Sequence, residues 1–403
     1  MFGSNDPDNP MGGFLGDLLK VIGSAPGGGD AWFDAARTLA FGVATDGVDD
    51  DNADPLVRIA FEELARVAEL HVAEATGISL AAGGSQIAFD AVGPGQWSYR
   101  VLTAYRPTLQ HMIDAQQQGA AVTPAAFDPD ALSGDPAGGL GGLLGQFAVT
   151  LGPVLLGMQF GSAAGHLARR AFGQYALPLP WPESNSLLLV PANVAQFAED
   201  WSLPLQEVQL WVCLRELTMH AVMTRPGLRS SLTTMLGDAS AHAAAAQRSL
   251  VERLGEGFGD GLGDDITLEG VLSDPESILA DLISPEQRSI SNALTALTTA
   301  INAYVDHITA KIATTLTSSP AALREAWYRH RVEDGKGEQA FAGLFGLDVG
   351  QAQVERGATF IDGVVARAGE DALARLWADE LDLPTPAEVD APGLWLARIG
   401  LAD

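Results

Sequence analysis

Near its middle, the chain of 403 residues reads W-V-C-L-R-E-L-T-M-H-A-V, from Trp211 to Val222. Pro204 precedes this run and can begin a helix, while Pro226-Gly227 follows it and can end one. We therefore expect one helix from Pro204 to about Thr224. Its single cysteine, Cys213, lies in apolar surroundings, so we expect it to be a core thiol. We expect the rest of the chain to be organised around this helix.

The charged part of the run has the frame of the zinc-binding motif H-E-x-x-H, with both histidines replaced. In that motif, two histidines one helical turn apart bind one zinc ion, and the glutamate beside the first activates the metal-bound water. Glu216 is retained, but Arg215 and Met219 stand at the two histidine positions. Arginine stays protonated and cannot bind a cation, and the thioether of methionine suits copper(I) better than zinc. The sequence therefore predicts no zinc at these two positions.

A replacement metal pair is the alternative reading of this helix. Glu216 and His220 also lie four residues apart. However, a shift of one residue turns the side chains by about 100° around the helix, away from the direction of the original third ligand. We therefore interpret both residues as core or surface residues and keep the relocated site as an alternative.

Composition restricts the partners of the protein. There are 51 acidic and 23 basic residues, which give a formal net charge of −28. Such a surface repels nucleic-acid phosphates and anionic lipids, so we expect neither nucleic acid nor a membrane as a partner. The apolar fraction of 47% is typical of a globular protein. One cysteine allows no intrachain disulfide, and the acidic N-terminus lacks the basic region of a signal peptide, so we expect a cytoplasmic protein.

The composition along the chain divides it into four parts. Residues 1–30 are rich in Gly and Asp, and we predict a flexible tail with a short amphipathic helix. Residues 31–119 have helical spacing, most clearly from Leu56 to Ala75. Residues 120–142 are rich in Gly and Pro and are predicted to be a linker. Residues 143–403 are predicted to form a helical core.

Two segments before the central helix have distinct patterns. Tyr175–Pro180 and Ser186–Pro191 flank W-P-E-S-N, which predicts one short β-hairpin. Leu143–Leu167 is the most apolar stretch, but its polar residues and Pro153 favour a buried helix pair over a membrane span. Its glycines recur at every fourth position, a spacing that suits close helix packing, within the chain or in a homo-oligomer: they are Gly157, Gly161 and Gly165.

Several further segments resemble one family. They are A-F-G-Q-Y-A-L-P-L-P at 171–180, V-P-A-N-V-A-Q-F-A-E-D-W at 190–201, G-L-F-G-L-D-V at 343–349, R-G-A-T-F-I at 356–361 and L-P-T-P-A-E-V-D-A-P-G-L-W-L-A-R at 383–398. With the central helix, and in this order, they resemble the zincin-like metallohydrolases of high-GC Gram-positive bacteria, some of which are labelled as associated with deazaflavin-cofactor biosynthesis. The resemblance covers most of the chain. It implies a mainly α, zincin-like metallopeptidase fold, to which the residues add one short β-hairpin.

The resemblance also implies where the zinc ligands of the family would stand. In the family motif H-E-V-T-H-H-A, the two zinc histidines correspond to Arg215 and Met219. A later family stretch, L-E-G-Y-x-D-H-V, supplies a glutamate ligand and corresponds to I-N-A-Y-V-D-H-I at 301–308, which puts Asn302 at the glutamate position. All three ligand positions are altered. The resemblance therefore implies that the zinc has been lost and that the protein holds no cofactor.

We expect the Arg215 guanidinium to lie where the family has its zinc ion. It would be held by Glu216 or Asp306 with Asn302 nearby, because a fixed cation would offset acidic groups that the metal once neutralised. Met219 would then be a core residue. Without a metal-bound water, Glu216 would be a vestigial general base.

The function predicted from the sequence is that of a catalytically inactive pseudo-peptidase whose former active-site cleft binds a protein or peptide partner. The alternative is a working zinc-dependent hydrolase that uses Glu216 with a displaced metal, bound by His220, His307 or Asp306. A third possibility is a structural subunit that forms a homo-oligomer.

Overall fold

The computed structural model describes residues 30–48, 50, 54–80, 87–120, 136–259, 284–332 and 336–401. The predicted N-terminal tail, except for its last residue, and most of the predicted linker lie outside these ranges.

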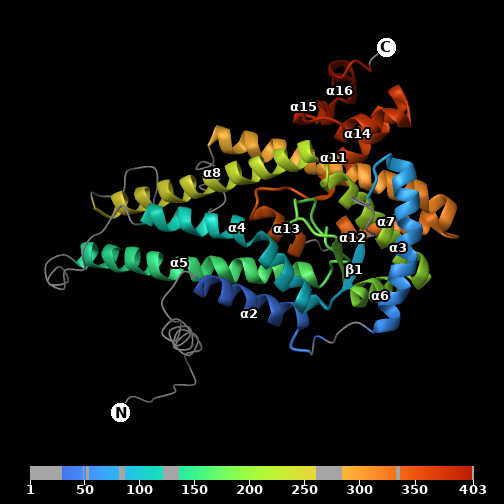
Figure 1. Ribbon diagram of the computed structural model, residues 1–403. Coiled ribbons are helices and arrows are strands. Elements are labelled where there is room, and N and C mark those ends of the chain that lie inside the picture. The colour runs from blue at the N-terminus through green and yellow to red at the C-terminus, as the bar shows by residue number, and fades with distance from the viewer. Residues whose placement is uncertain are drawn as a thin grey trace.

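Helices form most of the described structure, which confirms the predicted mainly α fold. Figure 1 shows α4, α5 and α8 as long rods side by side, with α2 along α5. The helices are α2 (Ala31–Thr45), α3 (Pro55–Thr76), α4 (Pro94–Ala120), α5 (Pro136–Ala168), α6 (Pro191–Asp200), α7 (Leu205–Met223), α8 (Pro226–Gly259), α11 (Pro285–Leu316), α12 (Pro320–Val332), α13 (Lys336–Gly343), α14 (Gln351–Ala368), α15 (Pro386–Asp390) and α16 (Pro392–Arg398), with the 3-10 helices η3 (Glu370–Trp377) and η4 (Glu380–Asp382).

Helix α7 is the central helix predicted from the sequence. Every residue from Val208 to Met223 is buried, including Cys213. Helices α3, α6, α8 and α11 pack around it. Each Leu, Val or Met side chain buried in this way contributes roughly 1.5–3 kcal/mol to stability. The charged residues of α7 are therefore carried into the interior by the apolar residues on either side of them.

The two strands form a parallel pair, so the predicted β-hairpin is wrong. Strand β2 (Ser186–Leu189) pairs with β1 (Ala88–Ala91), a strand far earlier in the chain, in the register Ala88↔Ser186 to Ala91↔Leu189. Pro178 and Pro180 occupy the predicted first strand of the hairpin, and proline has no N–H with which to pair. The Leu residues of β2 are all buried, as is typical of a strand covered on both faces.

Helix α5 replaces the predicted pair of helices with one continuous helix that passes through Pro153. It begins at Pro136, so the last part of the predicted linker, 136–142, is helical. No helix among the described residues is both long and apolar enough to cross a bilayer.

The glycine face of α5 packs against α2 within the same chain. A Cβ atom at Gly157 would lie 2.3 Å from the carbonyl oxygen of Trp32, and one at Gly161 would lie 2.2 Å from that of Ala36. The spacing therefore does predict close helix packing. Because α2 covers these glycines, they are not free for an oligomer contact, and the possible homo-oligomer stays a prediction.

The described helices share one hydrophobic core. The buried apolar cluster extends from Trp32 on α2 to Leu396 on α16. Helices of the predicted N-terminal region thus pack directly on helices of the predicted core region, as α2 does on α5 and α3 does on α7. The division of the chain into four parts stays a prediction.

The α2–α5 contact can be tested with Gly161→Ala. The added methyl group has no room beside the Ala36 carbonyl, so we expect the free energy of unfolding, measured by urea denaturation, to fall by about 1–3 kcal/mol. Gly237→Ala in α8 is the matched control, because no atom lies within 4 Å of the added Cβ. There the substitution should be neutral or stabilising by up to about 1 kcal/mol. Equal effects of the two substitutions would contradict the close packing.

Candidate functional site

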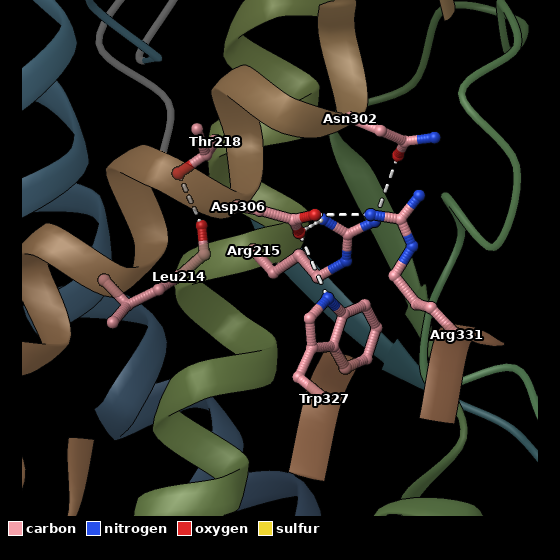
Figure 2. A network of polar contacts seen from close by, with 7 residues as sticks. All are labelled: Leu214, Arg215, Thr218, Asn302, Asp306, Trp327 and Arg331. Atoms are coloured by element: carbon pink, nitrogen blue, oxygen red, sulfur yellow. Dashed lines mark hydrogen bonds and ion pairs between the residues drawn. The ribbon is translucent and has the colours of Figure 1, made fainter. Parts of the chain in front are cut away.

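Arg215 reaches from α7 into a network of polar side chains on α11 and α12 (Figure 2). Its Nη1 atom donates a hydrogen bond to Asp306 Oδ1 at 2.9 Å, and its Nη2 atom donates to Asn302 Oδ1 at 3.2 Å. The guanidinium carbon lies 4.5 Å from the centroid of the Trp327 ring, a cation–π contact. The side chain is only 7% exposed. Partners on two other helices therefore hold a buried cation in one position.

Asp306 on α11 is the anion of this network. Its Oδ1 atom also accepts a hydrogen bond from Trp327 Nε1 at 3.0 Å, and its Oδ2 atom accepts one from Arg331 Nη1. One carboxylate thus forms ion pairs with two guanidinium groups. Charge-assisted bonds of this kind are about twice as strong as those between neutral groups. The network joins α7, α11 and α12 at one point.

The structure brings together two of the three positions at which the sequence analysis expected former zinc ligands, Arg215 and Asn302. The expected contact of Arg215 with Asp306 is present, whereas no hydrogen bond joins Arg215 to Glu216 among the described residues. Met219 lies one turn further along α7, fully buried in the core. Whether these are former metal positions is a matter of ancestry and stays a prediction.

Glu216 faces the loop that precedes β2. It is buried, and its Oε2 atom accepts a hydrogen bond from the backbone N–H of Tyr175 at 3.0 Å. Burial raises the pKa of its carboxyl to about 7, although backbone N–H groups and the charge of Arg215 oppose the shift. Gly173 permits this approach, because a Cβ there would lie 2.4 Å from the Glu216 carboxyl carbon. A bridge between Gly173 and Leu189 anchors the loop to β2.

His220 contacts the same loop one turn later. Its Nδ1 atom lies 2.9 Å from the hydroxyl of Tyr175. Burial, with a smaller contribution from the charge of Arg229, lowers the pKa of His220 to about 4. Burial also raises the pKa of the Tyr175 hydroxyl, so both groups are neutral at pH 7. The two neutral groups share one hydrogen bond, and the tautomer of the imidazole sets its direction.

His307 pairs with a different part of the molecule. Its Nε2 atom lies 3.1 Å from Glu370 Oε1 on η3, and Lys311 donates to the other oxygen of the same carboxylate. The candidate ligands of a displaced metal, His220, His307 and Asp306, are thus engaged by separate partners. Among the described residues, no group of three or more His, Cys, Asp or Glu side chains could hold a metal ion.

A cavity of about 40 Å³ opens beside Arg215 and Glu216. Its other charged lining residues and its aromatic lining residues were not expected from the sequence: they are Arg170, Arg331 and Glu338, with Phe172, Tyr175, Trp327 and His330. Phe172 and Tyr175 belong to the segment 171–180, which carries part of the family resemblance. That resemblance was the one signal in the sequence that could have pointed to them as site residues. Trp327 to Arg331 read W-Y-R-H-R, but a helix rich in Arg and aromatic residues is common and marks no site by itself.

Comparisons with known proteins agree with this architecture. A family model described as zincin-like metallopeptidase matches residues 32–396. A solved structure from Chloroflexus aurantiacus, described as a candidate hydrolase with a novel fold, is similar to the chain with a TM-score of 0.56 and 20% sequence identity. The match covers 92% of this chain and 99% of that one. At this identity it shows a shared fold. No curated protein matches the chain.

Glu216→Gln should change the pH dependence of stability. Between about pH 4.5 and 7, folded Glu216 keeps a proton that the unfolded chain has released, so the free energy of unfolding falls as pH rises through this window. Above about pH 7, the free energy of unfolding is lower by about 3 kcal/mol than at pH 4.5 because of this one group. Glutamine carries no charge and can still accept from Tyr175 N–H. We expect the variant to match the wild type near pH 4.5 and to exceed it at pH 8, measured by urea denaturation.

The control for this measurement is Glu63→Gln on the exposed face of α3. It should change the free energy of unfolding by less than about 0.5 kcal/mol at either pH. A Glu216→Gln variant that loses stability equally at both pH values would show that the carboxyl is ionised in the folded protein.

Arg215→Met tests the network around Asp306. The substitution keeps an unbranched side chain but leaves Asp306 with only two of its three donors, so we expect a loss of about 3 kcal/mol in the free energy of unfolding. Arg100→Met is the control, because Arg100 pairs with Asp90 on the surface, where both side chains are about half exposed. It should cost less than about 1 kcal/mol. Similar losses of stability in Arg215→Met and Arg100→Met would mean that the buried network contributes no more than a surface ion pair.

Proposed function

The chain belongs to the zincin-like metallopeptidase family, and we propose that it is a member that has lost zinc-dependent hydrolysis and uses the former active site to bind a protein or peptide partner. One observation carries the proposal: the Arg215 guanidinium is hydrogen-bonded to Asp306 and Asn302, at the place in the chain where the family motif has its first zinc histidine. A fixed organic cation thus stands at the position of a metal ligand.

The zinc ion that the family implies does not fit these residues. Arg215 is itself a cation and repels a second one, and it has no lone pair to offer. Its hydrogen bonds also occupy the side-chain oxygen of Asn302 and one oxygen of Asp306. Met219 offers a soft thioether in a fully buried position, which suits zinc poorly.

Glu216 is retained, but the metal-bound water on which it would act as a general base in the family is not expected here. A general base in this position acts on a water whose pKa the metal has lowered. Here the carboxyl is buried and accepts a hydrogen bond from the backbone N–H of Tyr175. We propose that Glu216 now serves to hold the loop before β2 and is a vestigial base.

The cavity beside Glu216 supports the binding part of the proposal. It combines charged groups with aromatic walls, and a concave site of that composition is the usual place for a ligand. A cavity of about 40 Å³ cannot enclose a whole peptide. We propose that it receives one group of a partner whose remainder lies on the surface.

A relocated zinc site has no comparable support. His220 is hydrogen-bonded to Tyr175, His307 pairs with Glu370, and Asp306 pairs with two arginines. A metal at any of them would have to displace these partners. Metal analysis of the purified protein decides the matter: stoichiometric zinc that disappears in His220→Ala would overturn the proposal.

The triple variant Arg215→His, Met219→His and Asn302→Glu should regain zinc. It removes the fixed cation and restores two imidazoles one turn apart with a carboxylate on α11, a ligand set typical of catalytic zinc. We expect about one zinc ion per chain by elemental analysis, against none for the wild type. The single variant Asn302→Glu, which keeps Arg215, is the control and should bind none. A triple variant without zinc would show either that Asn302 does not stand at the third ligand position or that the correspondence with the family motif is wrong.

A further inference from the structure

Three arginines gather around the cavity beside Glu216. Arg170, Arg215 and Arg331 all line it. Asp306 forms ion pairs with Arg215 and Arg331 together, so one of these two charges is left over.

Arg170 is the third of these charges. Its Nη2 atom donates to the backbone carbonyl of His330 and lies 3.5 Å from the Nδ1 atom of the same residue. Neither group carries a negative charge. Within the part of the chain that the structure describes, Arg170 is in ion-pair contact with no carboxylate.

The two carboxyl groups in the cavity wall interact with these charges without ion-pair contact: Glu216 with Arg215, and Glu338 with all three arginines. Glu216 and Glu338 line the cavity, and neither forms an ion pair among the described residues. Burial raises the pKa of both, which favours their neutral forms. His330 lines the same cavity. Burial first, then the charges of Arg170 and of the other two arginines, lower its pKa to about 3 against the opposing effect of a hydrogen bond with Arg170.

We propose that this cavity binds a carboxylate, namely the C-terminal carboxylate of a peptide partner. Guanidinium groups present paired N–H donors that match the two oxygens of a carboxylate. The cavity holds about 40 Å³, and since one water needs roughly 10–15 Å³ of such space, it accepts a group of carboxylate size and excludes a larger head group. The inference deepens the proposed function and rests on it.

The aromatic walls and the charge of the whole chain favour a peptide terminus over other anions. Phe172 and Trp327 line the cavity and make part of its wall apolar. The chain carries a net charge of −28, which repels polyanions such as nucleic acids. A peptide terminus brings one negative charge on an otherwise neutral chain, so it suffers this repulsion least.

The experiment compares three probes by calorimetry and ligand-detected NMR at low salt: N-acetyl-Ala-Ala-Ala-Leu with a free carboxylate, the same peptide as its C-terminal amide, and acetate. We expect the free acid to bind, the amide to bind at least about tenfold more weakly, and acetate to compete with the free acid. The affinity of the free acid should fall as salt is added, because screening weakens charge pairing.

Variants of Arg170 locate the binding to the cavity. Arg170→Gln should weaken binding of the free acid by about tenfold and leave the amide unchanged. Arg170→Lys, which keeps the charge, should restore part of the affinity and so separate charge from folding. Arg169→Gln is the matched control, because this neighbour is half exposed and lies 3.8 Å from Asp46, outside the cavity.

Each other outcome overturns a defined part of the inference. Equal binding of acid and amide would leave a peptide site and reject the carboxylate. Binding of acetate without the peptide acid would leave an anion site and reject the peptide terminus. If no free acid binds at about 10 mM, weaker than any useful recognition, the inference fails. The proposed loss of zinc-dependent hydrolysis is tested separately, by metal analysis of the purified protein.

Discussion

The carboxylate of Asp306 is the group on which the site depends. A guanidinium buried without a counter-ion is costly by several kcal/mol, and Arg215 lies in the interior because α7 is apolar on both sides of it. Asp306 compensates that charge from α11 and at the same time fixes Arg331 and Trp327 on α12. The position of α12, and with it one wall of the cavity, therefore follows from the need to neutralise one arginine.

The opposite wall depends on a second, uncharged set of contacts. The loop at Gly173–Tyr175 is tied to β2 by one bridge and receives both Glu216 and the imidazole of His220. Glycine is required there because any side chain would collide with the Glu216 carboxyl. The parallel pair of β1 and β2 thus matters less for its own few hydrogen bonds than for placing this loop against α7.

Helices could be predicted from the sequence because their signals are local. The flanking prolines place α7 almost to the residue, because a helix was expected from Pro204 to about Thr224 and runs from Leu205 to Met223. The predicted β-hairpin was wrong for the opposite reason. The partner of β2 is a short strand about 100 residues earlier, and neither segment has a local pattern that identifies the other as its partner. The glycine spacing in α5 indicated a close helix contact, but the identity of α2 as its partner is a property of the fold.

Residue identity alone settles that Arg215, Met219 and Asn302 are a poor zinc set, because the donor atoms of a side chain do not depend on its surroundings. It could not settle which carboxylate neutralises Arg215. Glu216 is adjacent in the chain, yet Asp306, 91 residues away, makes the contact. Arg170 and Arg331 became site residues only through the packing of α12 against the loop after α5. Charge balance and pKa depend on distances and burial, and these are set when segments remote in sequence meet.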